Sequence, residues 1–376
     1  MKSKMLVFLN SFWSRGTIIS GGDVVAVEVV KSVADKFEEI VWVTNFSGKK
    51  FIGPVNAYEY IIYTDLLDRL GVTLSYILRI FFIFFKKRFY NFYNTALSTS
   101  DFLTDVLPAF IYKKFNPQTN WVCFVHHIYP SYKIRNGNKL LNFIAQYAQK
   151  ISFRLLKKAD CVIAHSHQLK QTLLEIGLEN VQIVYPKIKY LENIALAKEK
   201  YNGVFMSRLK PSKGIFELID IWQLVVQQIK SAKLAIIGAG ENKIIKKIKN
   251  KIRVKNLENN IQMFGHLNDE FAFSLIKSSD VFLLPSHEEG FSLVIAEVMA
   301  QGVPVIAWGL PVFDEIYEDK IIKVKEKDKV CFSRQIIELL LNTDKRRAFG
   351  EQGKKFVLHK FNWQTNVEKY LNILCH

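Results

Sequence analysis

The chain has 376 residues, which exceeds the length of one ordinary domain. Its apolar fraction of 49% is enough for two packed cores and excludes a wholly disordered protein. Its four cysteines show no C-x-x-C spacing, which excludes a disulfide framework or zinc site and indicates a cytoplasmic protein. The net charge of +17 fits an anionic partner, but no helix-turn-helix, zinc-finger or RRM signature is present, so nucleic acid is not expected.

The first half of the chain reads as alternating strands and helices. Residues 5–10 predict a first strand, because their apolar run is too short for the core of a signal peptide. Gly21 and Gly22 precede a predicted helix over 24–36, for which Asp23 is the expected N-cap, and paired glycines let a backbone approach a ligand closely. Further strands are predicted at 40–44, 95–99, 121–125, 159–164 and 181–184, and further helices at 101–109 and 168–177.

One segment, 70–93, is unusually rich in Phe, Ile and Leu and contains the basic run Lys86, Lys87 and Arg88. Its uninterrupted apolar stretch is far too short to span a bilayer. Two interpretations stay open: an interfacial helix on an anionic membrane, or a buried core helix with a solvated basic end. Basic residues at 154, 157 and 158 would extend the same surface.

Polar residues follow two of the predicted strands in this half. His126 and His127 come at the carboxyl end of the strand at 121–125, where parallel sheets bind ligands. A purely structural histidine is the alternative, and which of the two faces a ligand stays open. Ser166 lies between two histidines after the next strand, but no G-x-S-x-G elbow is present, so we expect an N-cap rather than a nucleophile.

The second half begins after a charged segment, 187–200, which we interpret as a linker. A strand at 203–207 leads into a loop with Arg208 and Lys213, two cations that can neutralise a diphosphate. Gly238-Ala239-Gly240 lacks the third glycine of a dinucleotide site, so NAD is not expected. The remaining strands are predicted at 233–238, 261–264 and 321–324, and the helices at 215–230, 243–255, 268–278, 328–342, 344–356 and 362–374.

Residues 281–308 form the most informative stretch, predicted as strand 281–284, a polar loop, helix 293–300 and strand 304–308. This compact βαβ unit requires a parallel pairing with a right-handed crossover. Ser292 is the expected N-cap, and the N–H groups of Leu293 and Val294 would point at a bound anion. Glu289 and Glu297 lie beside this helix start, where carboxylates suit hydroxyl groups, so the corner predicts a sugar-nucleotide site.

The same corner resembles a known family. Glu289 and Glu297, with Gly290 and Phe291 between them and Ala300, Gly302 and Pro304 after, match the paired-glutamate motif of the family 4 (group 1) glycosyltransferases. The resemblance implies the α/β GT-B fold: two Rossmann-like βαβ domains facing a central cleft, with a C-terminal helix crossing back to the first. We expect the acceptor-side domain at 1–186 with the terminal helix at about 360–376, and the nucleotide-sugar domain at 201–359.

The resemblance also implies roles for the second-domain residues in a retaining glycosyltransferase. Arg208 and Lys213 would bind the donor diphosphate together with the helix start at 292–294. Glu297 would hold the ribose hydroxyls of the donor, and Glu289 those of the sugar. No D-x-D triad is present, so neither a bound metal nor another cofactor is required by the sequence.

In the first domain the resemblance places Gly21 and Gly22 toward the donor diphosphate and His126 near the donor sugar and acceptor. The donor is expected to be a UDP-, GDP- or ADP-sugar, and the acceptor a glycan or lipid-linked hydroxyl in surface polysaccharide or glycolipid synthesis. Together with segment 70–93, this suggests a cytoplasmic enzyme held peripherally on the inner face of the membrane.

Two other classes of function remain as alternatives. A GT-B-like sugar-nucleotide epimerase would need additional acid/base carboxylates, of which the sequence shows no clear set. A membrane-binding or nucleic-acid-binding protein with a decayed site would not need the Arg208, Lys213, Glu289 and Glu297 set, whose presence argues against it.

Overall fold

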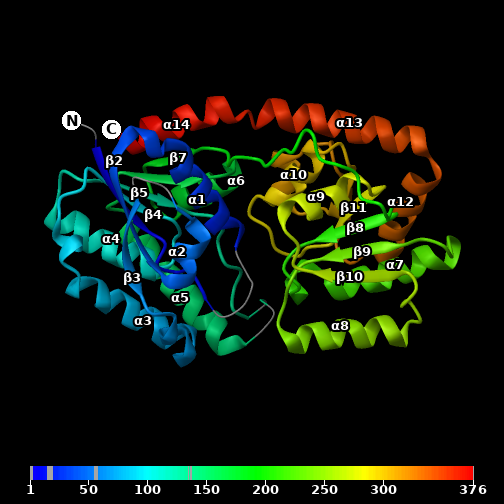
Figure 1. Cartoon of the computed structure of the whole chain (residues 1–376), viewed down its shortest axis with the longest axis horizontal. Helices are drawn as coiled ribbons and strands as arrows, with labels where there is room; N and C mark the ends of the chain where they lie inside the picture. The colour runs from blue at the N-terminus through cyan, green and yellow to red at the C-terminus, as the bar shows by residue number, and fades with distance from the viewer. Residues whose placement is uncertain (1–2, 15–19, 55–57, 134, 136–137, 376) are drawn as a thin grey trace. The chain divides into compact units, whose positions relative to one another are not determined.

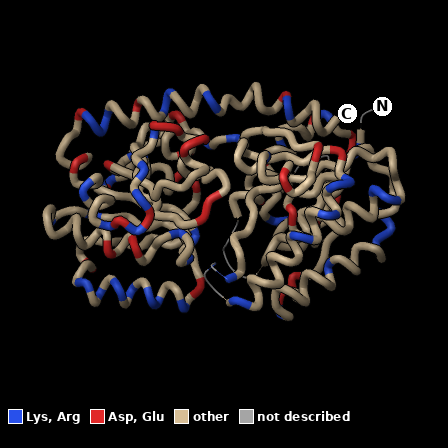
Figure 2. The backbone as a smooth tube through the Cα atoms, turned by 180° about the vertical axis from the view of Figure 1, so that it is seen from behind, with Lys and Arg blue, Asp and Glu red and all other residues tan. Residues whose placement is uncertain are grey.

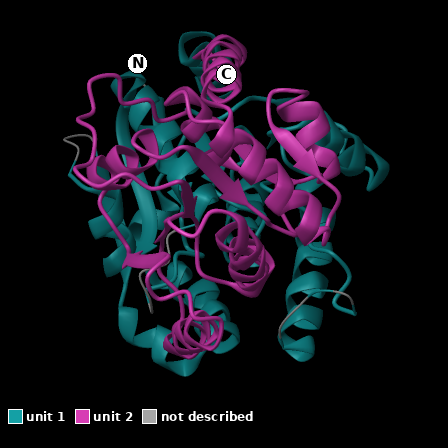
Figure 3. Ribbon diagram, turned by 90° about the vertical axis from the view of Figure 1, so that its right-hand side faces the viewer, with its two compact units in different colours: residues 1–187, 363–376 teal, residues 188–362 magenta. Residues whose placement is uncertain are grey.

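A computed structural model describes residues 3–14, 20–54, 58–133, 135 and 138–375. The chain divides into two compact units (Figure 3). Unit 1 holds residues 1–187 and 363–376, and unit 2 holds residues 188–362, so the predicted linker lies almost wholly in unit 2. Each unit is built around one parallel sheet, which gives the two Rossmann-like α/β layers of the GT-B fold.

The sheet of unit 1 has the strand order β3-β2-β1-β4-β5-β6-β7, with all neighbours parallel. Its strands are β1 (Ser3–Phe8), β2 (Phe37–Asn45), β3 (Tyr58–Tyr63), β4 (Thr95–Ser98), β5 (Asn120–Phe124), β6 (Cys161–Ala164) and β7 (Val181–Ile183). The central strands are mostly apolar and mostly buried, as expected for a parallel sheet covered on both faces. The strand order reverses between β1 and β4. The carboxyl ends of these two strands border the region in which such sheets bind ligands.

Helices cover both faces of this sheet (Figure 1). They are α1 (Gly21–Val33), α2 (Phe46–Ile52), α3 (Val72–Phe82), α4 (Leu103–Phe115), α5 (Lys139–Leu156), α6 (His167–Glu175) and α14 (Trp363–Cys375). Helix α4 contacts both α3 and α5, so these three form one layer, whereas α14 contacts α1 and β5. The C-terminal helix therefore returns to unit 1, as the resemblance implied.

The start of α1 differs from the prediction. Ser20, not Asp23, is the N-cap: its hydroxyl accepts from the Asp23 N–H at 3.1 Å, and the Asp23 carboxylate accepts from the Ser20 N–H at 3.0 Å. This reciprocal capping box places Gly21 and Gly22 in the first turn of the helix rather than in a loop. The expected N-cap at Ser166 is confirmed, since its hydroxyl accepts from the Leu169 N–H at 3.1 Å.

Segment 70–93 folds as α3 followed by two 3-10 turns, η3 (Ile83–Phe85) and η4 (Lys87–Tyr90). One face is core: Ile80, Ile83 and Phe89 are buried. Arg79 is buried too and pairs with Asp68 at 2.5 Å, which belongs to the turn η2 (Asp65–Leu70). The opposite face is exposed, so the core interpretation holds for one side of the helix, and the membrane interpretation of the other side stays a prediction. Within the described residues, no helix is long and apolar enough to cross a membrane.

The sheet of unit 2 has the order β10-β9-β8-β11-β12-β13, again with all neighbours parallel. Its strands are β8 (Gly203–Met206), β9 (Leu234–Ile237), β10 (Ile261–Gly265), β11 (Val281–Leu284), β12 (Val305–Trp308) and β13 (Ile322–Val324). Its α-helices are α7 (Ile215–Gln228), α8 (Asn242–Val254), α9 (Asp269–Lys277), α10 (Leu293–Ala300), α11 (Pro311–Ile316), α12 (Lys329–Leu341) and α13 (Thr343–Lys360). Lys and Arg run along α8 (Figure 2).

Candidate active site

The candidate site of unit 2 lies where the strand order reverses, between β8 and β11. The loops that follow these strands are tied together, because the N–H of His287 donates to the Ser212 carbonyl at 2.9 Å. Gly214 has φ +69°, and a Cβ there would lie 1.7 Å from the carbonyl oxygen of Pro285. Only glycine allows this approach, which brings the predicted cationic loop against the predicted acidic loop.

Lys213 and Glu289 are in direct contact across these loops. The Lys213 Nζ lies 2.8 Å from the Glu289 Oε1 and donates to the Glu288 carbonyl at 3.1 Å. Both side chains are largely buried. The sequence predicted both as donor-binding residues but not that they would bind each other.

Arg208 lies on the same loop as Lys213 and is partly exposed. Unlike Lys213, its guanidinium forms no hydrogen bond or ion pair with any other described residue. A guanidinium with no hydrogen bond to another described residue, on the same loop as the buried Lys213, is suited to bidentate binding of a phosphate.

Helix α10 begins at this corner without the expected side-chain cap. Ser292 occupies the N-cap position in a left-handed conformation, φ +64°, and its buried hydroxyl has no hydrogen-bond partner among the described residues. The hydroxyl of Tyr317 donates to the carbonyls of Phe291 and Ser292 and holds this strained turn. Leu293 and Val294, partly exposed, follow it with N–H groups that the Ser292 side chain does not cap.

Glu297 lies one turn further along α10, at the same end of the sheet. Burial raises the pKa of its carboxyl to about 8, against the opposing charge of Lys189. Its carboxyl also accepts a hydrogen bond from the backbone of Lys189, whose side chain pairs with Asp269. The group is therefore largely protonated at neutral pH and, like Ser292, sits ready to exchange hydrogen bonds with a polar ligand.

The sequence analysis missed His287, whose ring links the loop after β11 to two other segments of unit 2. Its Nδ1 lies 2.6 Å from Glu326 and its Nε2 3.4 Å from Glu217 on α7. The hydrogen bond to Glu217 is the main cause that raises the pKa of His287, and Glu326 adds to it against burial. The available signal was a histidine directly after a buried strand, but its partners lie 70 and 39 positions away in the sequence.

In unit 1, the structure brings His126 and Gly22 together. The His126 Nε2 hydrogen-bonds the Thr99 carbonyl at 2.9 Å, and a Cβ on Gly22 would lie 2.6 Å from its ring. Burial lowers the pKa of His126. Gly21 has open space around it, and the ring of His127 packs on Tyr129 instead.

Two buried carboxylates that the sequence analysis missed shape the loop after β1. Asp105 accepts from the N–H groups of Asn10 and Ser11 at 2.8 and 2.9 Å, and burial raises its pKa to about 7. Asp68 accepts from Ser14, and its partner Arg79 donates to the carbonyls of residues 10 and 12. The described part of this loop is thus held by side chains rather than by its own turns.

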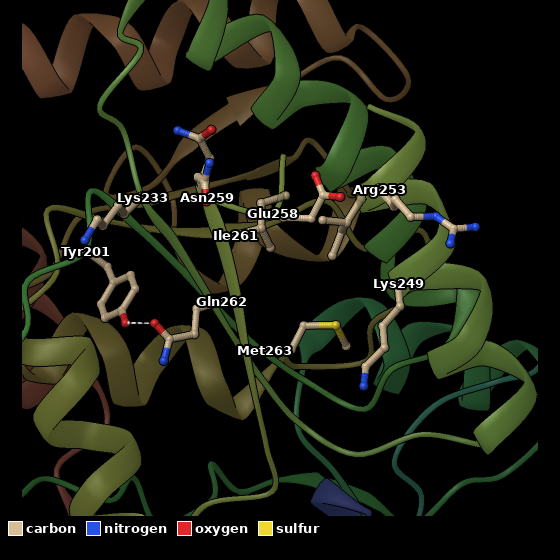
Figure 4. A pocket seen from close by; sticks show the side chains of 11 residues that line it. Tyr201, Lys233, Lys249, Arg253, Glu258, Asn259, Ile261, Gln262 and Met263 are labelled. Atoms are coloured by element: carbon tan, nitrogen blue, oxygen red, sulfur yellow. Dashed lines mark hydrogen bonds between the residues drawn. The ribbon is translucent and has the colours of Figure 1, made fainter. Parts of the chain in front are cut away.

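An open pocket lies elsewhere on unit 2, between the C-terminal end of α8 and the edge strand β10 (Figure 4). Lys249, Arg253 and Gln262 are among its lining residues. None of the candidate residues lines it, so it is separate from the corner at β8 and β11.

The two parallel-sheet units, with paired glutamates and cations at the switch point of unit 2, define a glycosyltransferase of the GT-B architecture. Residues 186–356 match the family described as "Glycosyl transferases group 1". Over these residues, which are just under half of the chain, the protein is similar to this family of enzymes.

Individual relatives agree with this assignment. The chain is 28% identical over 314 residues to an uncharacterized glycosyltransferase of Methanocaldococcus jannaschii, covering 78% of this chain and 79% of that protein. It is 30% identical to a capsular polysaccharide biosynthesis glycosyltransferase of Staphylococcus aureus, over 53% of this chain and 54% of the relative. In fold it is similar to HepE of Anabaena, solved with UDP and glucose, with a TM-score of 0.76, 15% identity and 99% of each chain covered.

Proposed function

We propose that the protein is a retaining glycosyltransferase that moves a sugar from a nucleoside-diphosphate sugar to a hydroxyl of a glycan or lipid-linked acceptor. The contact that carries the proposal is the Lys213–Glu289 pair. Arg208 lies on the same loop as Lys213, and Glu289 precedes the start of α10, which has no side-chain cap. One small region thus offers cations and N–H groups for phosphate together with carboxyls for hydroxyls. The nucleotide and glucose bound by HepE and the capsular role of the S. aureus relative support this substrate class.

The proposed reaction breaks the bond between the anomeric carbon and the β-phosphate oxygen. The electron pair stays on that oxygen, while the acceptor oxygen bonds to the anomeric carbon and passes its proton to the leaving diphosphate. Arg208, Lys213 and the N–H groups at 292–294 would stabilise the charge that builds on the diphosphate. Because Lys213 is already bound to Glu289, donor binding would exchange part of this contact for phosphate.

The other candidate residues receive positioning roles. Glu297 would hold the ribose hydroxyls and Glu289 the sugar hydroxyls. In unit 1, Gly22 fixes His126, which would contact the donor sugar or orient the acceptor, and Gly21 would leave the backbone open to the diphosphate. Since the cations and backbone N–H groups supply the positive charge that stabilises the diphosphate, we expect activity without a metal. Loss of turnover in EDTA that Mg²⁺ restores would contradict this expectation.

The donor site is tested by a thermal-shift panel with UDP, GDP, ADP and their common sugars. A ligand at 100 times its Kd should stabilise the protein by about 2.7 kcal/mol. We expect one nucleotide to respond, with the response lost in Glu297→Ala and kept in Glu270→Ala, an exposed glutamate on the neighbouring helix α9. No response to any nucleotide would overturn the proposal, and conversion of the sugar nucleotide to its epimer without acceptor would favour the epimerase alternative.

Membrane attachment belongs to the same proposal. The exposed face of α3 and the basic residues 86–88 would hold the enzyme peripherally at an anionic membrane on the cytoplasmic side. This placement would give access to a lipid-linked acceptor.

A further inference from the structure

Helix α5 presents an apolar face to solvent that no other described helix or strand covers, although the ring of Tyr132 in the preceding loop packs against Phe143. Its first half exposes large apolar side chains, of which Leu140 is 66% accessible. The exposed residues are Leu140, Leu141, Phe143, Ile144 and Tyr147. Their spacing by one, three, four and seven positions places them on one side of the helix.

The other side of α5 is firmly anchored. Its second half buries Gln149, Phe153 and Leu156 against the unit, and Gln149 donates to the buried Asp101 at 2.7 Å. The helix also contacts α4. The apolar residues of the first half are therefore held outward on a rigid element, rather than exposed by fraying of the helix.

A second apolar patch lies in the same helical layer, on α3 and the turn η3. Leu74, Ile77, Phe81 and Phe85 are exposed, Phe85 at 81%, while Arg79 on the opposite side is buried. Helix α4 contacts both α3 and α5, and both lie on the lower side of unit 1 in Figure 1. We call the exposed residues of the two patches together the apolar surface.

The charges on α3, η3, η4 and α5 themselves are of one sign, although the exposed Glu59 of β3 pairs with Arg88. The sequence has no Asp or Glu in residues 69–100 or 106–159, which include all of α3 and α5. The same stretches supply exposed basic side chains, namely Lys86, Lys87, Lys150, Arg154, Lys157 and Lys158. In unit 2, by contrast, the exposed large apolar residues are isolated and lie among acidic as well as basic residues: Leu196, Val254, Phe271, Val330, Leu341 and Leu358.

These two properties distinguish the occupants that could cover such a surface. A second copy of the chain would bring like charges face to face, with no carboxylate on α3 or α5 to pair them. A soluble polyanion would use the charges but leave the apolar residues in water. An anionic bilayer satisfies both, because the side chains enter the acyl boundary while Lys and Arg lie among the phosphates.

We propose that unit 1 docks on an anionic lipid surface through α5 as well as α3, with the first half of α5 inserted at the level of the lipid headgroups. This deepens the membrane part of the proposed function. It does not depend on sugar transfer, because none of the residues of the apolar surface is a candidate residue of the active site.

The experiment is flotation of the full-length protein with vesicles of phosphatidylcholine alone and of phosphatidylcholine mixed equally with phosphatidylglycerol. We expect binding to the mixed vesicles, reduced roughly tenfold or more by replacing Leu140, Leu141 and Ile144 together with Ser. The matched control replaces three exposed apolar residues of unit 2, Val254, Phe271 and Leu341, with Ser and should bind as wild type. Replacing Lys86 and Lys87 with Gln should narrow the preference for the anionic vesicles.

The outcomes separate this proposal from the donor-site proposal. Wild type that binds neither vesicle, or a triple α5 variant that binds as tightly as wild type, would overturn the docking surface. So would a dimer in sedimentation velocity that the α5 substitutions abolish, because the apolar surface would then join two copies. The nucleotide thermal shift is measured on the same α5 variant and should be unchanged, so loss of the donor site is detected independently.

Discussion

At the scale of single residues, the two cations of the candidate donor site are in different states. Lys213 is held by Glu289 and by the Glu288 carbonyl, whereas the Arg208 guanidinium makes no hydrogen bond or ion pair with the residues that the structure describes. A phosphate can therefore bind Arg208 without breaking a protein contact, but must compete with a carboxylate for Lys213. We infer that Arg208 makes the first contact with the diphosphate, and that Lys213 contributes once Glu289 has turned to sugar hydroxyls.

This assignment predicts a strong effect of Arg208→Ala on turnover. Removing one fixed partner of the developing charge should lower kcat on the order of 10²–10³-fold. The fold should be intact, because the side chain has no hydrogen bond or ion pair with another described residue to lose. Lys243→Ala, which removes an exposed cation from α8 in the same unit, is the control and should leave steady-state turnover unchanged. Near wild-type kcat in Arg208→Ala would exclude the proposed role.

His287 predicts a dependence of stability on pH. Its two carboxylate partners raise its pKa above the ordinary value of about 6.5, so the folded state favours the protonated ring. The protonated ring therefore stabilises the fold fully at pH values below about 6.5, the ordinary pKa of histidine. This stabilisation is lost as the pH rises through the raised pKa of the folded state. We expect His287→Gln to lower the Tm at pH 6 and to differ little from wild type at pH 9.

Thermal unfolding at several pH values, followed by circular dichroism, measures this difference. His266→Gln is the control, since that histidine is exposed and does not join the two loops. A Tm difference between His287→Gln and wild type that stays constant with pH would mean that the charge on the ring plays no part.

At the scale of elements, the first turn of α1 and the strand end of β5 are fitted to each other. A Cβ on Gly22 would lie 2.6 Å from the His126 ring, whereas one on Gly21 meets nothing within 4 Å. Both positions are in the helix, where Ala is favoured over Gly by about 1 kcal/mol. Ala substitutions at the two positions therefore distinguish an effect of helix propensity from an effect on the packing of the His126 ring.

We expect Gly21→Ala to leave the Tm unchanged or raised, and Gly22→Ala to displace the His126 ring. If His126 contacts the donor sugar or acceptor, Gly22→Ala should also lower kcat/KM, as a misplaced catalytic group does. The measurement is turnover of the two variants side by side, with the His126 ring resonances recorded by NMR. A Gly22→Ala variant with a shifted ring and full activity would remove His126 from the site.

The sequence analysis predicted features that neighbouring residues form and missed contacts between residues far apart in the sequence. The corner at 281–308 was predicted because strand, loop and helix follow one another within a short stretch. The capping box at Ser20 was missed because Asp23 alone also fits a cap. The Lys213–Glu289 pair joins residues 76 positions apart, and Asp105 binds the loop after β1 from 95 positions away. No periodicity or spacing reports such contacts, which exist only once the strands are ordered in the sheet.

The buried ion pair of unit 1 gives an element-scale prediction. Arg79 holds the loop after β1 through two carbonyls, and its removal leaves Asp68 buried without its countercharge. We expect Arg79→Met to lower the free energy of unfolding by about 3–5 kcal/mol in urea denaturation. Arg88→Met is the matched control, because its pair with Glu59 is exposed and should cost less than about 1 kcal/mol. Equal costs for the two variants would refute the anchoring role of Arg79.

At the scale of the whole molecule, the chain finishes unit 1 only after unit 2 is complete. Helix α14 supplies buried side chains to unit 1, and its last carbonyls accept from Thr95 on β4 and Asn120 on β5 at 2.7 Å. Unit 1 is therefore discontinuous in sequence: its first 187 residues lack a helix that covers part of the sheet. Unit 2, residues 188–362, is continuous and carries the proposed donor site.

This arrangement predicts that damage to α14 affects the two units unequally. Tyr370 is fully buried, and its ring packs against Phe124 of β5. Tyr370→Ala should lower the free energy of unfolding of unit 1 by about 3–5 kcal/mol, as for other large buried side chains. Lys369→Ala, exposed on the same helix, is the control. The urea midpoint of the unfolding transition, followed by the fluorescence of unit 1 tryptophans, should shift to lower concentration. Nucleotide binding by unit 2 should persist at urea concentrations where unit 1 has unfolded. Loss of nucleotide binding in step with unit 1 would show instead that the donor site depends on both units being folded.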